Sequence, residues 1–483
     1  MKSRASTLLS GLTWTYSSQI LSVVVQFGYA AITSRLVTSG GFGTYAVALT
    51  VAGFVSLIAN GGLGQSVSRM VSVEDKVIGG LASFSILLGI GGSALLYVSA
   101  GFWSSVWGDQ NAKFVIELLC ISLIVSPHIG LNLGLMRREG KFRKLAISTF
   151  VSNSIGMLVG LALVVTLQSS ASLVASPIVS QLMLLILCSI HNRGRLLRFR
   201  TIGGAKSDIG FSVNVIVSNL LSYFASNLGK WSVSRWIGAP ALGQWNRADV
   251  VTTVPFFQLQ TAIVQVVYPE FRHDREGSAR SRTVWPDLLT LVAWLCVPLA
   301  CLAIPILPLV VPILFGEGWN VAATLSGPLV LIAAVQVVTT VLGGAVEALG
   351  KFRWIWSSQV IMILIQLAGV VCTVISRSLV PAVVSMGLVV IGRQAIYVLL
   401  CHRAKLFSAI HLLKNYSFVF AASLVSGFVG YLVSISIVSL WNACFTVAVS
   451  SVLVCSAYRW RSRLPPVVIF QRYKQLRTDV NPA

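Results

Sequence analysis

Long apolar runs alternate with short polar segments along the whole chain. A helix needs about 20 apolar residues to cross the hydrocarbon core of a bilayer. Runs of about that length occur at about 10–34, 44–64, 78–100, 113–135, 145–166, 170–190, 209–229, 243–267, 286–314, 320–346, 354–375, 379–401, 416–436 and 438–458. The pattern predicts an all-α polytopic membrane protein with about 14 transmembrane helices. The run at 286–314 contains several prolines and is expected to be kinked.

Composition supports this prediction. Of the 483 residues, 55% are hydrophobic and only 10% are charged, and the mean hydropathy is +0.83. An average soluble domain carries about 25% charged residues. A soluble protein of this size would lack the charge to cover its surface, which excludes a large soluble enzyme.

The charges are strongly biased in sign and in position. The net charge is +22, and of the 36 Lys and Arg residues 29 fall in the loops and tails of one predicted side, against five on the other. Positive residues concentrate in the cytoplasmic loops of membrane proteins. We therefore expect both termini in the cytoplasm and a location in the cell inner (plasma) membrane. No water-exposed basic module is present in the sequence, so no nucleic-acid partner is predicted.

Cysteine use and known motifs predict no cofactor and no metal. The eight cysteines lie within or at the ends of apolar runs and form no CxxC pair, which indicates buried apolar packing rather than zinc or disulfide chemistry. No phosphate-binding Walker A motif is present, so direct use of ATP is not expected. The first apolar run exceeds the core of a signal peptide, and we expect it to be an uncleaved span.

The chain also contains an internal repeat. Ser34-Arg35 is followed by Gly43, and 200 residues later Ser234-Arg235 is followed by Gly243. The sequence Gly-Lys-Phe-Arg occurs at 140–143 and again at 350–353. Both pairs indicate a period of six helices, so the halves should share one orientation, as in transporters built from parallel repeats. We expect a six-helix bundle with a basic linker at 1–208, a second bundle at 209–415, an extra hairpin at 416–458 and a basic cytoplasmic tail at 459–483.

These motifs resemble a known family. The stretch from Arg35 through Phe-Gly43-Thr-Tyr45, and the block 234–272 with its Tyr-Pro-Glu-Phe-Arg ending, are similar to the polysaccharide flippases (Wzx type) of the multidrug/oligosaccharidyl-lipid/polysaccharide flippase superfamily. The resemblance implies a MATE-like fold. It covers nearly the whole chain, with one departure: the family often has an acidic residue before the lysine of span 7, whereas Gly229 precedes Lys230 here.

The resemblance implies export, by alternating access, of a polyprenyl-diphosphate-linked oligosaccharide from the inner to the outer leaflet. The implied partners are this lipid-linked substrate, membrane lipids, and a polysaccharide polymerase with its chain-length machinery. A multidrug or lipid II exporter of the same superfamily is the alternative. A membrane polysaccharide polymerase is disfavoured because every predicted outer loop is short, and the chain is expected not to be an enzyme.

Cationic groups near or within the spans are the candidates for binding a diphosphate, since charges at membrane depth are costly and often functional. Arg393 lies well inside span 12, and Arg247 lies about one turn into span 8. Arg247 could instead pair with Asp249 or extend toward the interface. Three further candidates, Lys230, Arg235 and Arg35, lie near the outer ends of spans 7 and 1, where anchoring at the interface is the alternative.

Three titratable residues are candidates for proton coupling: His128, Asp249 and Glu117. His128 follows a proline in the middle of span 4 and could titrate near neutral pH. A hydrogen-bonded histidine with only a packing role is the alternative for this position. Glu117 lies near the end of its span, where partial exposure is a sufficient explanation.

Overall fold

A computed structural model of the chain describes residues 21–60, 75–192, 223–273, 281–348 and 352–436, together with a few isolated residues and a short segment at 465–468. Every regular element among these residues is a helix. In hydrocarbon, backbone N–H and C=O groups have no water to bond, and a helix satisfies them within one segment. The described part of the chain therefore confirms the predicted all-α fold.

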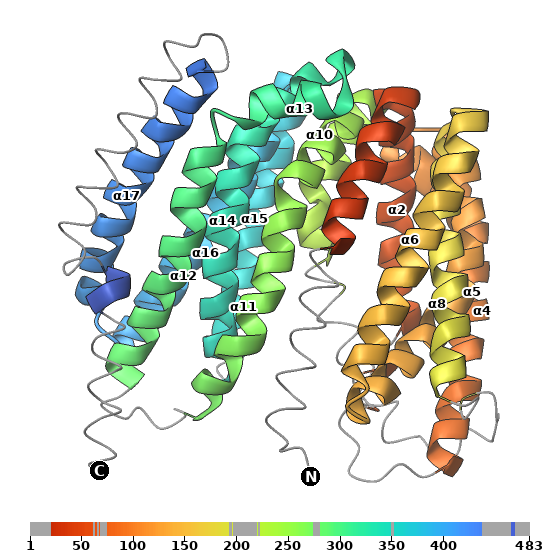
Figure 1. Ribbon diagram of the computed structural model, residues 1–483, viewed down its shortest axis with the longest axis horizontal. Helices are drawn as coiled ribbons and strands as arrows, with labels where there is room; N and C mark the ends of the chain where they lie inside the picture. Colours follow the sequence, from red (N-terminus) through yellow and green to blue (C-terminus); the bar gives the residue numbers. More distant parts are fainter. Residues whose placement is uncertain are drawn as a thin grey trace. The chain divides into compact units, whose positions relative to one another are not determined.

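Helix packing divides the chain into two compact units. Unit 1 is Met1–Asn246 with Val370–Ala382, and unit 2 is Arg247–Gly369 with Val383–Ala483. The described elements of unit 1 are helices over 21–36 and 223–236, α2 (Ser39–Asn60), α4 (Asp75–Trp107), α5 (Ala112–Arg138), α6 (Phe142–Leu167), α7 (Ser170–Leu173), α8 (Ala175–His191) and the first part of α10 (Ala239–Val251). Within this unit α4 packs along α5 and α6 packs along α8 (Figure 1).

Unit 2 is built around a central helix. Its elements are α11 (Thr253–His273), α12 (Ser281–Ala303), α13 (Leu307–Phe315), the short η3 (Glu317–Trp319), α14 (Asn320–Ala348), most of α15 (Phe352–Ser376), most of α16 (Val380–Arg403) and α17 (Ala409–Ser436). α14 packs against α11, α12 and α13, and α12 also packs against α17. Because α14 meets neighbours on several sides, more of it is buried than of any other candidate span in the described residues.

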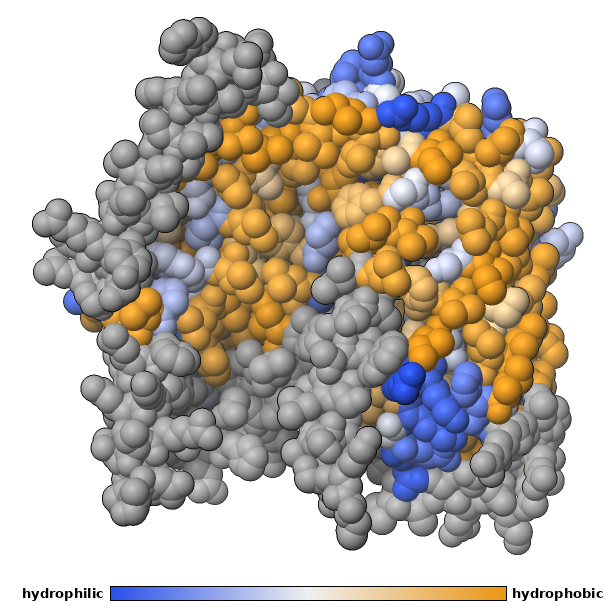
Figure 2. All heavy atoms as spheres, in the orientation of Figure 1, coloured by the Kyte–Doolittle hydropathy of each residue, from blue (hydrophilic) through white to orange (hydrophobic). Residues whose placement is uncertain are grey.

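Ten described helices are long and apolar enough to cross a membrane, and they coincide with the predicted spans 2–6 and 9–13. Their flanks carry exposed aliphatic side chains, including Val98 at 84% and Ile375 at 79% exposure. Figure 2 shows such hydrophobic side chains covering the helix flanks. Surface of this kind suits contact with lipid, and the chain is a multi-pass membrane protein. The predicted spans 1, 7 and 14 lie partly or wholly outside the described residues, so the count of 14 stays a prediction.

Two predicted spans are interrupted rather than continuous. The run at 243–267 is two helices, because α10 ends at Val251 and α11 begins at Thr253. The run at 286–314 is broken between α12 and α13, where Pro305 lacks the N–H that a continuing helix would use. The expectation of one kinked helix at 286–314 is replaced by two helices.

The repeat is visible in the helix boundaries. The helices over 21–36 and 223–236 end at equivalent positions, and after two non-helical residues α2 and α10 begin at Ser39 and Ala239. α6 begins at Phe142 and α15 at Phe352, inside the repeated Gly-Lys-Phe-Arg motif. The residues just after these helices, Gln168 and Arg377, share a left-handed backbone with φ of 47° and 50°.

The predicted domain boundary at 208/209 lies outside the described residues, and the proposed division of the chain stays a prediction. Unit 1 extends to Asn246 because the helix over 223–236 is tied to the end of α4. The Ser234 hydroxyl donates to the carbonyl of Trp107 at 3.0 Å, and the Trp231 indole donates to the carbonyl of Val106 at 3.0 Å. The end of unit 1 where α4 ends and α2, α5 and α10 begin is called the predicted outer end below.

Candidate functional site

Lys230 lines a small polar cavity in unit 1. The cavity has a volume of about 230 Å³ and lies between α2, α10 and the helix over 223–236; its other lining residues are Ala46, Leu49, Thr50, Tyr223, Asn227, Leu242 and Asn246. The Lys230 side chain is half-buried. An ammonium among amide and hydroxyl groups in a concave site can bind an anionic or strongly polar group.

A second cavity, about 220 Å³ in volume, adjoins the first and shares Thr50, Tyr223 and Asn227 with it. Its walls are rich in aromatic side chains: Phe54, Trp103, Trp107, Phe224 and Trp231. Aromatic faces offer large apolar contact area to a ring-shaped ligand. The two cavities together place a cation beside an aromatic-lined pocket.

Hydrogen bonds and ring contacts hold the aromatic walls in place. The Tyr223 hydroxyl donates to the carbonyl of Thr50 at 2.9 Å, which ties the helix over 223–236 to α2. Phe54 meets Trp103 edge-on, with ring centroids 5.6 Å apart. The sequence analysis identified Lys230 but not these aromatic residues. Their only sequence signal is a high density of aromatic residues at 102–107 and 223–236.

Arg35 and Arg235 occupy equivalent places in the repeat and are both exposed, each near the end of its helix. The side chain of Arg235 lies against Gly108, because its Cδ is 3.2 Å from where a Cβ atom would stand at that glycine. Neither arginine lines the two cavities around Lys230. Their positions suit the alternative of anchoring at the membrane interface.

The other two arginines belong to unit 2. Arg247 is buried, with its guanidinium carbon 5.9 Å from the centroid of the Phe315 ring. An Nη2–H of Arg393 on α16 donates to the side-chain oxygen of Gln359 on α15 at 3.2 Å. The Nε of Arg393 is buried and has no hydrogen-bond partner among the described residues, which leaves a donor for a further acceptor. The two cavities around Lys230 are lined by residues of unit 1 alone and include neither of these arginines.

Each of the three proton-coupling candidates has local contacts of its own. His128 is only 5% exposed, and its Nδ1 is 2.9 Å from the Ser85 hydroxyl. Asp249 accepts a hydrogen bond from the Thr253 hydroxyl at 3.1 Å. The Glu117 Oε1 atom lies 3.9 Å from the Nζ atom of Lys113, which is one turn earlier in α5. The contact with Ser85 is in keeping with a packing role for His128. Among the described residues, no group of three His, Cys, Asp or Glu side chains is placed to hold a metal ion.

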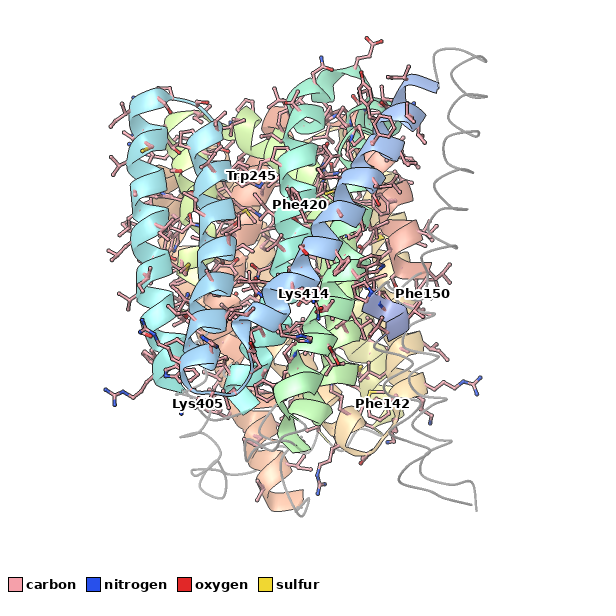
Figure 3. The ribbon with its side chains drawn as sticks, turned by 90° about the vertical axis from the view of Figure 1, so that its left-hand side faces the viewer. Phe142, Phe150, Trp245, Lys405, Lys414 and Phe420 are labelled. Atoms are coloured by element: carbon pink, nitrogen blue, oxygen red, sulfur yellow. The ribbon has the colours of Figure 1, made fainter. Side chains whose placement is uncertain are left out.

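Unit 2 contains a larger, almost entirely apolar cavity of about 690 Å³ along α12, α14 and α17. Among its lining residues are Cys301, Pro305 and Phe420, and Figure 3 shows Phe420 well along α17. The wall contains a few polar groups, among them the Gln394 amide, which donates to the Tyr416 hydroxyl at 3.2 Å. A cavity of this size and polarity can accommodate a flexible hydrocarbon chain.

Comparison with known proteins identifies relatives of the chain. Residues 32–324 match the family described as "Polysaccharide biosynthesis protein". Over 371 residues, 22% are identical to the teichuronic acid biosynthesis protein TuaB of Bacillus subtilis (strain 168), covering 75% of this chain and 76% of that protein. Over 333 residues, 23% are identical to the succinoglycan biosynthesis transport protein ExoT of Rhizobium meliloti (strain 1021), covering 68% of this chain and 66% of that protein.

Solved structures give the same fold. The lipid II flippase MurJ, in an inward closed conformation, aligns with a TM-score of 0.68 over 89% of this chain and 98% of its own, at 11% identity. An outward-facing multidrug resistance MATE family transporter of the MOP superfamily aligns with a TM-score of 0.55 over 85% of this chain and 96% of its own, at 12% identity. These alignments confirm the expected MATE-like architecture.

Proposed function

Because the chain belongs to the family of polysaccharide biosynthesis proteins, we propose that it exports a lipid-linked oligosaccharide for the assembly of a cell-surface glycan. The substrate is a polyprenyl-diphosphate-linked repeat unit, moved from the cytoplasmic to the outer leaflet by alternating access. The protein works in the cell inner membrane with both termini in the cytoplasm, and it passes its substrate to a polysaccharide polymerase.

The observation that carries this proposal is the pair of adjoining cavities around Lys230 and Tyr223 in unit 1. A diphosphate taken out of water needs a fixed positive partner, and Lys230 supplies one in a half-buried place. The aromatic pocket beside it offers apolar faces to a sugar ring. A cation next to an aromatic pocket therefore matches the junction between a diphosphate and its first sugar. Arg393 and Arg247 are proposed as separate cationic contacts for a diphosphate within unit 2.

Deletion of the gene tests the proposed function. Lipid-linked repeat units should accumulate on the cytoplasmic leaflet while their synthesis continues. Wild-type protein should restore export, and Lys230→Gln should fail to do so at normal protein abundance. Lys414→Gln is the matched control, since it makes the same chemical change at an exposed lysine on α17 (Figure 3).

The alternatives predict different products. Loss of the repeat unit itself would place the protein earlier, as an enzyme of synthesis. Accumulation of lipid II in place of the repeat unit would assign the lipid II exporter function instead.

A further inference from the structure

A polar cleft of about 940 Å³ opens at the predicted outer end of unit 1, apart from the cavities around Lys230. Its walls are the first turns of α2, α5 and α10, the α4–α5 loop and the segment at 169–171. Side chains that bear carboxylate, amide, hydroxyl and aromatic groups all contribute to the lining. The proposed transport of a diphosphate assigns no task to this surface.

The floor of the cleft is a fixed carboxylate. Asp109 is 7% exposed, and its Oδ2 accepts a hydrogen bond from the Thr44 hydroxyl at 2.6 Å. Its Oδ1 accepts from the backbone N–H of Asn111 at 3.0 Å, which also sets the start of α5. A carboxylate oxygen has two acceptor positions. Asp109 is therefore held rigidly and retains capacity to accept further hydrogen bonds.

The rim of the cleft combines exposed amides with an exposed aromatic ring. Gln110 and Asn111 are exposed, and Phe114 is 59% exposed although it lies in the first turn of α5. Amides and carboxylates match the donors and acceptors of sugar hydroxyls, and an aromatic face packs against the apolar face of a sugar ring. The ion pair of Lys113 with Glu117 adds one cation. The lining of the cleft thus contains two carboxylates, those of Asp109 and Glu117, and one ammonium, and this balance of charge does not suit a polyanionic ligand.

The equivalent place in the other repeat holds a buried aromatic side chain instead of exposed polar groups. Asp109-Gln110-Asn111 stands directly before α5, and Glu317-Gly318-Trp319 stands directly before α14. Asn111 is exposed, whereas Trp319 is 3% exposed and packs edge-on against Phe315 with ring centroids 6.4 Å apart. An apolar side chain fills the position in the second repeat, and polar groups leave it open in the first.

We propose that this outer cleft binds the saccharide part of the exported unit through its hydroxyl groups, independently of the lipid and the diphosphate. The inference rests on the proposed function and adds a second binding place for the same substrate class. The ligand is an uncharged or weakly acidic oligosaccharide, and Phe114 and Asn111 are its principal contacts. Such a site would hold the glycan outside the membrane after its head group has left the Lys230 cavity.

Protection from chemical labelling tests the site directly. The probe is the repeat-unit oligosaccharide released from the strain's own polysaccharide, free of lipid and phosphate. In the purified protein, Gln110→Cys should react with a polar maleimide, and saturating oligosaccharide should slow the reaction at least about fivefold if most sites are filled. Thr166→Cys, an exposed position that does not line the cleft, should react at the same rate with and without the oligosaccharide. Equal rates at Gln110→Cys would overturn the proposal.

Affinity measurements separate this proposal from the proposed function. Phe114→Ala should weaken oligosaccharide binding up to about tenfold, and Phe114→Trp should retain it. Lys230→Gln should bind the free oligosaccharide as wild type does while failing to export the lipid-linked unit. If Phe114→Ala binds as wild type, the cleft is not the site, whatever the export assay shows. If Phe114→Ala weakens oligosaccharide binding but deletion of the gene leaves export intact, the cleft is a saccharide-binding site and the proposed export function is wrong.

Discussion

Gly43 and Gly243 lie at equivalent positions of the repeat, and each lies against the first turn of the other's helix. A Cβ atom at Gly43 would overlap the carbonyl of Ala239, and a Cβ atom at Gly243 would overlap the carbonyl of Ser39. Ser39 and Ala239 are equivalent residues as well, so the contact is symmetric. α2 and α10 thus approach each other backbone to backbone at equivalent positions, which is consistent with a two-fold relation between these two helices of the repeat.

Replacing either glycine with alanine should destabilise the protein. Gly43→Ala and Gly243→Ala force α2 and α10 apart, and overpacking of this kind costs about 1–3 kcal/mol. A lower midpoint in a thermal unfolding assay of the purified protein is the expected result. Gly101→Ala is the control, because a Cβ atom at Gly101 has no heavy atom within 4 Å. Unchanged midpoints for all three variants would show that the crossing is not tight.

Thr44→Val should also reduce stability, through the loss of one hydrogen bond. The Thr44 hydroxyl donates to the buried carboxylate of Asp109 at 2.6 Å, and removing a hydrogen bond to a charged group costs about 1.5–3 kcal/mol. Thr166→Val makes the same change on an exposed hydroxyl that bonds only within its own helix. A thermal midpoint that falls for Thr44→Val but not for Thr166→Val is expected, and equal midpoints would contradict the role given to Asp109.

Arg393→Gln should abolish export without lowering protein abundance, if Arg393 contacts the diphosphate as proposed. Arg393→Lys should restore part of the activity, because lysine keeps the charge but loses the planar fork of donors. Gln359→Ala removes the side-chain acceptor that lies 3.2 Å from the Arg393 guanidinium. This variant tests whether the hydrogen bond between α15 and α16 is itself needed for export. Normal export by Arg393→Gln at wild-type abundance would refute the assignment.

His128→Asn should leave the pH dependence of export unchanged. The His128 ring is buried and lies 2.9 Å from the Ser85 hydroxyl, so the expected effect is a loss of stability of about 1–3 kcal/mol rather than a loss of coupling. Export by membrane vesicles, measured across a range of pH, checks this expectation. A flattened pH profile in a variant of normal abundance would instead support the proton-coupling role.

The orientation of the chain can be tested with two introduced cysteines. Glu317 and Arg137 are both exposed and lie in loops or helix ends predicted to face opposite sides. In intact cells a membrane-impermeant reagent should label Glu317→Cys and spare Arg137→Cys, because the positively charged loops are predicted to be cytoplasmic. Labelling of Arg137→Cys from outside would reverse the proposed topology.

The sequence by itself determined the ten spans that the structure describes and the repeat within them. Apolar length alone decides whether a helix can cross a bilayer, and local motifs such as Gly-Lys-Phe-Arg fix where α6 and α15 begin. The interruption at Thr252 was not predicted, because the hydropathy of an apolar run is the same whether one helix or two successive helices form it.

Only the tertiary structure decided which side chains meet. Lys230 was recognisable as a cation near a span end, but Thr50 on α2, which lines the same cavity, is far away in the sequence and comes close only through helix packing. Arg393 was recognisable as a charge inside a span, but its contact with Gln359 depends on how α16 is rotated against α15. Contacts between side chains of different helices depend on how those helices pack. The sequence pattern of a single helix does not specify this packing.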